Sequence, residues 1–213
     1  YVPKGYKTES NVVNSTNDKN YKQMLTSPIF YVMIILLTCG AFSGMMIISQ
    51  AAGLAQEMVQ MNAMAASTAV SVLALFNASG RIVAGSLSDK IGRIYTLVIA
   101  LVLSILGVGI LYTIHNGDVA KFYVAVSIVG ISFGAFMGVF PGFTADQFGA
   151  KNNSVNYGIM FIGFAAAGFF GPTVMKSVGT YTSAFLIAFV LNCCGLLLCV
   201  LYHQLTKKTK YNV

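Results

Sequence analysis

The chain has 213 residues, of which 56% are hydrophobic and only 9% are charged, and its formal net charge is +7. An ordinary soluble domain has about a quarter of its residues charged, so this composition excludes that class and indicates a membrane protein. The Lys and Arg residues are dispersed between apolar runs rather than gathered on one face, which argues against nucleic-acid binding.

The first 26 residues are polar, contain Asn and Ser runs, and lack the apolar core of a signal peptide. This composition predicts a linker or tail over residues 1–26 that is disordered rather than folded. A second short tail, basic in character, is expected over residues 207–213.

Apolar segments fill the chain between these tails. A bilayer-spanning helix needs roughly 20 mostly apolar residues. We expect six such helices, over residues 28–49, 64–87, 94–114, 121–141, 154–176 and 182–204. The predicted fold class is therefore an all-α membrane protein in which residues 27–206 form a six-helix transmembrane bundle, and residues 50–56 are expected to be a loop.

Lys and Arg are concentrated on one side of the predicted bundle: in the N-terminal tail, in the second-to-third and fourth-to-fifth connections, and at the C-terminus. The opposite side carries only Lys121 and Lys176. Because cytoplasmic loops of membrane proteins are enriched in Lys and Arg, both termini are predicted to be cytoplasmic, in a plasma or inner membrane.

Small residues recur within the helices. Gly130, Gly134 and Gly138 are four residues apart and therefore share one helical stripe, while several glycines precede Pro172 in the next helix. Small residues let membrane helices approach closely, and a Gly-Pro pair can break a helix beside a cavity. Tight packing and a pore-lining or hinge role are both open interpretations.

No metal or cofactor is expected. The four cysteines lie inside apolar runs, no Cys/His cluster has metal-ligand spacing, and no ATP-binding loop is present. Glu57, Asp118 and Asp146 fall in predicted connections, so no acidic side chain is expected deep inside a helix.

Arg81 is the first candidate for ligand binding. It lies eight residues before Asp89, which places it about 12 Å deeper along a helix. A cation at that depth costs about 2.5–3.5 kcal/mol, so it should face protein or water and have a partner. Either its guanidinium binds a substrate carboxylate with two parallel hydrogen bonds, or it snorkels to the interface or pairs with Asp146.

Three polar residues are further candidates for substrate binding. Asn77 lies one helical turn from Arg81, where its amide could orient Arg81, contact substrate or bond a neighbouring helix. Gln50 is a weaker candidate of the same kind. Tyr157 is another, although its place near a helix end also suits an interfacial tyrosine.

Residues 85–93 have the sequence GSLSDKIGR, in which Gly85 and Gly92 bracket Asp89, Lys90 and, at the end, Arg93. Glycines give the backbone the freedom needed for a turn between two helices. The charges are expected to act as a gating loop that pairs with a neighbouring helix end in one state and releases it in another. Direct contact with substrate is not expected here.

The pattern of this loop resembles the signature loop of the major facilitator superfamily. Further segments resemble the oxalate/formate antiporter family within it, including its eighth helix, its eleventh helix and its central linker. These segments are NASGR at 77–81, TADQFG at 144–149, NYG at 156–158, FFGP at 169–172 and YVPKGY at 1–6.

The resemblance implies the C-terminal half, helices seven to twelve, of a twelve-helix carrier whose N-terminal six-helix half is missing. Such carriers exchange small organic anions by alternating access, and Arg81 matches the helix-eight arginine associated with binding the anion. The oxalate-specific member also uses a lysine in helix eleven, whereas residues 158–175 contain no basic side chain. This departure favours a monocarboxylate such as formate, lactate or pyruvate over oxalate.

Other classes of function remain open at this point. A carrier of the same fold for a drug or sugar would be favoured if Arg81 pointed away from the central cavity. An intramembrane hydrolase would need a buried nucleophile beside a buried base. Ser79 could be the nucleophile, but neither histidine lies deep in a helix, where it could act as the base. A non-transporting sensor or scaffold is the remaining alternative. Taken together, these residues predict a carrier and not an enzyme.

Overall fold

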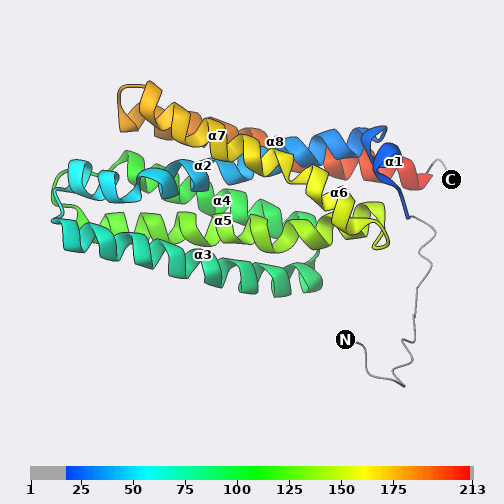
Figure 1. Cartoon of the computed structure of the whole chain (residues 1–213), viewed down its shortest axis with the longest axis horizontal. Coiled ribbons are helices and arrows are strands. Elements are labelled where there is room, and N and C mark those ends of the chain that lie inside the picture. Colours follow the sequence, from blue (N-terminus) through cyan, green and yellow to red (C-terminus); the bar gives the residue numbers. More distant parts are fainter. Residues whose placement is uncertain (1–17, 212–213) are drawn as a thin grey trace, which may run out of the picture.

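The computed structural model describes residues 18–211, with side chains described for residues 18–207. This part of the chain is helical throughout, and its helices lie side by side along one long axis (Figure 1). The helices are α1 (Tyr21–Leu25), α2 (Pro28–Val59), α3 (Ala63–Ile91), α4 (Arg93–Tyr112), α5 (Val119–Phe148), α6 (Asn153–Met160), α7 (Ile162–Ser177) and α8 (Tyr181–Tyr211).

Six spans in the described residues are long and apolar enough to cross a membrane, which confirms the predicted number. Five are single helices, and the remaining one, the fifth span in chain order (Asn153–Ser177), combines α6 and α7. The predicted ends were too short in two places. α2 continues through the expected loop 50–56 to Val59, since AAGLAQE is rich in helix-forming residues. α5 continues past Pro141 to Phe148.

The tails also differ from the prediction. Residues 1–17 lie outside the described part of the chain, but Tyr21–Leu25 form α1, so residues 18–26 are not disordered. The Asn20 side chain accepts a hydrogen bond from the Gln23 backbone, and the Gln23 side chain accepts one from the Asn20 backbone, so the two residues cap the N-terminal end of α1 reciprocally. At the other end of the chain, α8 continues into the predicted basic tail as far as Tyr211.

The fifth span is interrupted at Phe161, where a turn separates α6 from α7. For the Gly-Pro pair at 171–172 the sequence left both a break and tight packing open, and in the structure Pro172 lies inside α7, which continues to Ser177. Gly171 packs on α2, since a Cβ there would lie 3.1 Å from the Phe42 carbonyl and the Met46 amide. The glycine therefore serves close packing and not a break.

The helices contribute unequally to the core. In the apolar window of α2, 67% of residues are buried within the structure, and in that of α5 61%, whereas in α3 only 17% are. Large aromatic side chains of α5, among them Phe136 and Phe140, are fully buried around α2. α3 thus lies on the outside of the bundle, with most of its surface uncovered.

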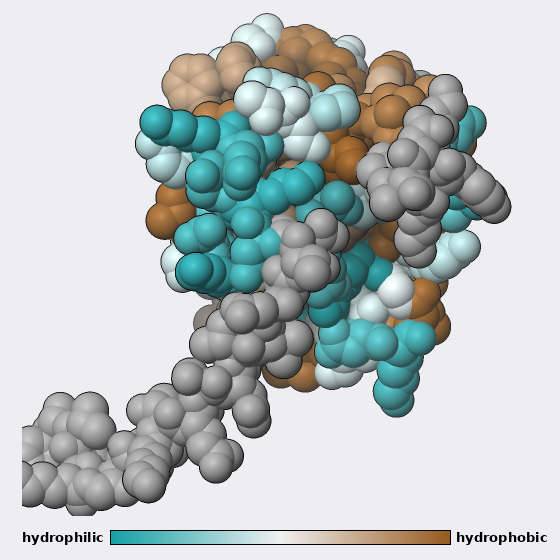
Figure 2. Space-filling view, turned by 90° about the vertical axis from the view of Figure 1, so that its right-hand side faces the viewer, coloured by the Kyte–Doolittle hydropathy of each residue, from teal (hydrophilic) through white to brown (hydrophobic). Residues whose placement is uncertain are grey.

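The two ends of the bundle differ in character. The end that holds α1, the α3–α4 turn and the α5–α6 connection is here named the α1 end. Hydrophilic residues gather over it, and hydrophobic ones surround them (Figure 2). Apolar side chains cover the flanks instead, for example Ile99 and Leu106 of α4 and Leu197 of α8. This distribution fits helices that cross a bilayer with the α1 end in water.

Candidate functional site

Arg81 lies on the uncovered side of α3, about 15 Å from Ile91 where the helix ends. Within the described residues, the structure gives its side chain no salt bridge and no hydrogen bond. Its neighbours one and two turns earlier on the same face, Ala78 and Ala74, are small and exposed. Arg81 therefore presents its charge to an open surface lined by small side chains.

Asn77 follows the same side of α3 and is half-buried. Its amide oxygen is buried and has no hydrogen-bond partner among the described residues. A buried polar atom without a partner is costly, so an acceptor left open one turn from a free guanidinium suits a ligand or a water molecule. The predicted proximity of Asn77 and Arg81 on one helix face is present in the structure.

The glycine stripe of α5 holds this part of α3 in place. A Cβ on Gly134 would lie 3.0 Å from the Arg81 amide nitrogen and closer still to the Asn77 carbonyl. A Cβ on Gly138 would collide with the Arg81 carbonyl, and one on Gly130 would lie 2.8 Å from the Leu73 carbonyl. The stripe is a packing surface, and it fixes the backbone from which Arg81 and Asn77 project.

Tyr157 lies on α6 and is half-buried. The side chains of Tyr157 and Arg81 are close enough to interact electrostatically, although 76 positions separate them in the chain. The Tyr157 ring contacts Phe161 at 5.6 Å between ring centroids, and Phe161 stacks on Phe164 at 4.5 Å. Asn77 and Arg81 therefore share one face of α3, and the charge of Arg81 reaches Tyr157 on α6.

Gln50 is placed elsewhere. It lines a cavity of about 290 Å³ at the end of the bundle opposite α1, together with Glu57 and Tyr181. The Tyr181 hydroxyl donates a 2.5 Å hydrogen bond to the Glu57 carboxylate, which joins α2 to α8. α2 ends at Val59 and α3 begins at Ala63, so these two residues lie at the same end of the bundle. Gln50 lies about 14 Å along α2 from that end, whereas Arg81 lies about 27 Å along α3 from it, so the two residues lie at different depths.

The predicted gating loop is mostly helix. α3 continues to Ile91, so Gly85 lies inside the helix and Asp89 and Lys90 occupy its last turn. Gly92 alone makes the turn, with φ 96° and ψ 151°, a conformation that only glycine adopts readily. The return between the helices is thus tighter than the sequence indicated, because one residue with positive φ suffices to reverse the chain.

Arg93 joins three helices at the α1 end. One guanidinium nitrogen lies 2.6 Å from the Asp89 carboxylate and 2.6 Å from the Ser88 hydroxyl, and its Nε lies 2.8 Å from the Asp146 carboxylate on α5. A Cβ on Gly142 would lie 2.9 Å from the guanidinium carbon, so glycine leaves room for it. The alternative in which Asp146 pairs with Arg81 is therefore wrong, since Arg93 holds that carboxylate.

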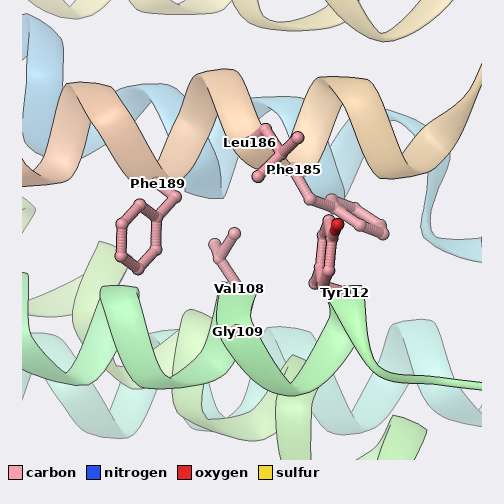
Figure 3. Close-up of a pocket in the computed structure, with 6 residues that line it drawn as sticks. All are labelled: Val108, Gly109, Tyr112, Phe185, Leu186 and Phe189. Atoms are coloured by element: carbon pink, nitrogen blue, oxygen red, sulfur yellow. The ribbon is translucent and has the colours of Figure 1, made fainter.

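A groove on the flank of the bundle has a different chemistry. It has a volume of about 160 Å³ and lies between α4 and α8, where Val108, Tyr112 and Phe189 face one another (Figure 3). Its remaining lining, Gly109, Phe185 and Leu186, is apolar as well. A groove without a charged group suits a hydrocarbon chain better than a polar solute.

Sequence reasoning missed the asparagines of the α5–α6 connection. Asn156 is fully buried, and its amide nitrogen donates a 3.0 Å hydrogen bond to the Lys19 carbonyl. Asn152 donates to the same carbonyl at 3.3 Å. The run KNNSVN at 151–156 could have indicated these contacts. Asn and Ser side chains readily form hydrogen bonds with backbone groups, and a cluster of them is unusual at the start of an apolar span.

Comparison with known proteins supplies the family. Residues 3–172 match the sequence profile of the Major Facilitator Superfamily. The chain belongs to this superfamily. An uncharacterized MFS-type transporter of Escherichia coli (strain K12), YhjX, is 32% identical to it over 160 residues, which are 74% of this chain and 40% of the relative.

Two further similarities refine this picture. The oxalate:formate antiporter of Oxalobacter formigenes is 28% identical over 180 residues, which are 83% of this chain and 43% of the antiporter. The crystal structure of an auto-inhibited POT family peptide transporter superposes with a TM-score of 0.71 at 16% identity, over 84% of this chain and 37% of that one. The last likeness shows the fold alone.

The chain therefore spans less than half the length of each of these transporters. The predicted superfamily and the predicted fold, a six-helix membrane bundle of major facilitator type, are confirmed. The protein is a multi-pass integral membrane protein of a transporter superfamily. Its substrate and its partner half are matters for proposal.

Proposed function

We propose that the chain is the C-terminal six-helix half of a secondary transporter that moves small organic anions by alternating access. Arg81 is the observation that carries this proposal. It is a cation without an acidic partner among residues 18–207, it lies well inside a membrane helix, and it faces an uncovered surface of α3. Such a charge needs a compensating anion, and a substrate carboxylate supplies one.

The surroundings of Arg81 give each group a role. The guanidinium binds the carboxylate with two parallel hydrogen bonds, Asn77 accepts a hydrogen bond from a substrate hydroxyl or an ordered water, and Tyr157 closes the site from α6. The similarity to an oxalate:formate antiporter supports the substrate class. Gln50 lies in another cavity and is proposed to contact solute there, at the opposite mouth of the pathway.

A monocarboxylate such as formate, lactate or pyruvate fits this half better than oxalate. The fifth span, Asn153–Ser177, has only one basic residue, Lys176, and that residue lies in the last turn of α7 at the end opposite α1. Among the described residues, Arg81 is therefore the single cation at its depth in this half, which matches a substrate with one negative charge. A second cation in the partner half would shift the preference towards a dicarboxylate.

The transport pathway is proposed to lie between this bundle and an N-terminal six-helix half. The uncovered α3 and the interrupted α6–α7 span would face that partner, and the two halves would rock around the bound anion. The ion pairs of Arg93 with Asp89 and Asp146 hold the α1 end in the present state and act as the gating contact.

The α1 end is proposed to face the cytoplasm of a plasma or inner membrane, with both termini on that side. Lys22, Lys90, Lys151 and Lys207 are exposed at this end, whereas Lys121 and Lys176 are the basic residues of the other end. This asymmetry follows the enrichment of Lys and Arg in cytoplasmic segments.

Uptake into proteoliposomes tests the proposal. The complete protein is reconstituted with labelled formate, lactate, pyruvate and oxalate and, for comparison, a neutral sugar. Arg81→Gln should abolish uptake of the carboxylate while the protein stays folded. Lys121→Gln is the matched control, because it removes one cation from an exposed site at the far end of α5.

Each outcome has a distinct meaning. Carboxylate uptake that survives Arg81→Gln would refute Arg81 as the anion site but leave the carrier in place. Uptake of the sugar and of no carboxylate would refute the substrate class. A folded protein that moves and binds none of these solutes would refute the carrier and favour a sensor or scaffold.

A further inference from the structure

α6 is attached to the bundle differently from the helix that follows it. α7 packs on α2 through glycines: a Cβ on Gly163 would lie 2.7 Å from the Ile34 carbonyl, and one on Gly171 would lie 3.1 Å from the Phe42 carbonyl. On α6, by contrast, a Cβ on Gly158 would meet no atom within 4 Å. The turn at Phe161 separates the two helices, so α6 has fewer constraints than α7.

The segment before α2 supplies the main polar tie to α6. The Lys19 amide donates a 2.8 Å hydrogen bond to the Phe148 carbonyl, and the Lys19 carbonyl accepts from Asn156 at 3.0 Å and from Asn152 at 3.3 Å. The backbone of one residue, Lys19, therefore connects the end of α5 to the first turn of α6. Met24, fully buried in the core, anchors this segment.

Asn156 stands out among these contacts because its side chain is fully buried. A buried amide that donates to a backbone carbonyl in an apolar surrounding makes a strong bond, and its loss leaves that carbonyl with the longer Asn152 contact alone. The next residue in the chain is Tyr157, which is half-buried and interacts electrostatically with Arg81. One turn of α6 thus carries both Asn156, which binds the Lys19 carbonyl, and the candidate site residue Tyr157.

We propose that Asn156 is a positioning residue that binds the Lys19 carbonyl and thereby holds Tyr157 at its distance from Arg81. The consequence for substrate rests on the proposed function, whereas the tie itself does not. Without the Asn156 amide, α6 pivots at the Phe161 turn, and the Tyr157 hydroxyl moves relative to the guanidinium. The segment ahead of α2 therefore communicates with the candidate anion site through a single buried side chain.

Hydrogen exchange of the purified complete protein tests the tie without any substrate. Asn156→Ala should raise exchange of the α6 amides, Asn153–Met160, by about 3- to 10-fold, the range expected for one hydrogen bond. Exchange in α7 should not change. Asn192→Ala is the matched control: it removes another fully buried asparagine, on α8, and should leave α6 unchanged.

A distance measurement tests the movement of Tyr157's helix. Spin labels at Gly158→Cys, where side chains have open space, and at the exposed Ala78→Cys of α3 report the α6–α3 separation in a background without reactive cysteines. Asn156→Ala should broaden or shift that distance distribution, and Asn192→Ala should not. Unchanged exchange in α6, or an unchanged distance, would overturn the proposal whether or not the protein transports an anion.

The link to substrate has its own test, a double-mutant cycle on anion uptake. Asn156→Ala and Tyr157→Phe should each raise KM by about 3- to 10-fold, and the double variant should be no worse than Tyr157→Phe alone. Effects that simply multiply would show that Asn156 acts by another route and would overturn the positioning role. If no anion is taken up by the wild type, the proposed function fails, while the exchange and distance measurements still decide the tie.

Discussion

Gly134→Ala should displace the backbone that carries Arg81. The added Cβ would lie 3.0 Å from the Arg81 amide nitrogen and nearer still to the Asn77 carbonyl, whereas non-bonded atoms normally stay about 3.5–4.0 Å apart. Both neighbours are backbone and cannot rotate away, so α3 must retreat from α5 by about 1 Å. Overpacking of this kind costs about 1–3 kcal/mol.

The effect on the site follows from the same displacement. A guanidinium moved by about 1 Å loses good geometry in one of its two hydrogen bonds to a carboxylate, and a bond to a charged group contributes about 1.5–3 kcal/mol. At 1.4 kcal/mol per tenfold, KM for the anion should rise by about 10- to 100-fold.

Thermal unfolding in detergent and anion uptake in proteoliposomes measure the two effects. The matched control is Gly109→Ala on α4, the same chemical change where a Cβ meets no atom within 4 Å. Since alanine is the better helix former, this control should be neutral or slightly stabilising. If Gly134→Ala unfolds at the same temperature as the control and transports equally well, the close approach of α5 does not position Arg81.

Other contacts give further expectations. Gly92→Ala should destabilise the fold by about 1–3 kcal/mol in thermal unfolding, because φ 96° strains any residue with a Cβ; unchanged stability would contradict the turn geometry. Asp146→Asn should lower stability by less than about 1 kcal/mol, and by less at high salt, because its pairing with Arg93 is partly exposed; equal losses at both salt concentrations would argue against an ion pair. Tyr181→Phe should speed hydrogen exchange at the start of α8 by losing its bond to Glu57, and no change there would show that this bond does not hold the helix.

The number of spans was predictable from the sequence because it depends on local hydropathy. Each apolar stretch must satisfy its backbone hydrogen bonds internally in a bilayer, so a stretch of sufficient length becomes a helix whatever its neighbours are. Helix ends obey weaker local rules. Residues 50–59 continue α2, and α5 continues past Pro141, because beyond the hydrocarbon core packing and intrinsic helix preference decide where a helix stops.

Part of the candidate site was also predictable. Asn77 and Arg81 share a face because they are one turn apart, and the spacing of the α5 glycines indicated a close helix contact. Tyr157 and Gln50 were weaker candidates, and their roles stay predictions. The charge of Arg81 reaches Tyr157 on α6, whereas the depth of Gln50 along α2 places Gln50 in a separate cavity.

The sequence by itself determined that this is a membrane bundle of helices with one cation deep in the second span, since hydropathy and helical spacing act over a few residues. The tertiary structure alone decided which polar groups meet. Arg93 pairs with Asp146 across 53 positions, Tyr181 with Glu57 across 124, and Asn156 with Lys19 across 137. Such partners depend on how each helix is rotated and how far it slides against the next. Those variables are set by packing over the whole bundle, including the glycines of α5, and no short stretch of sequence contains them.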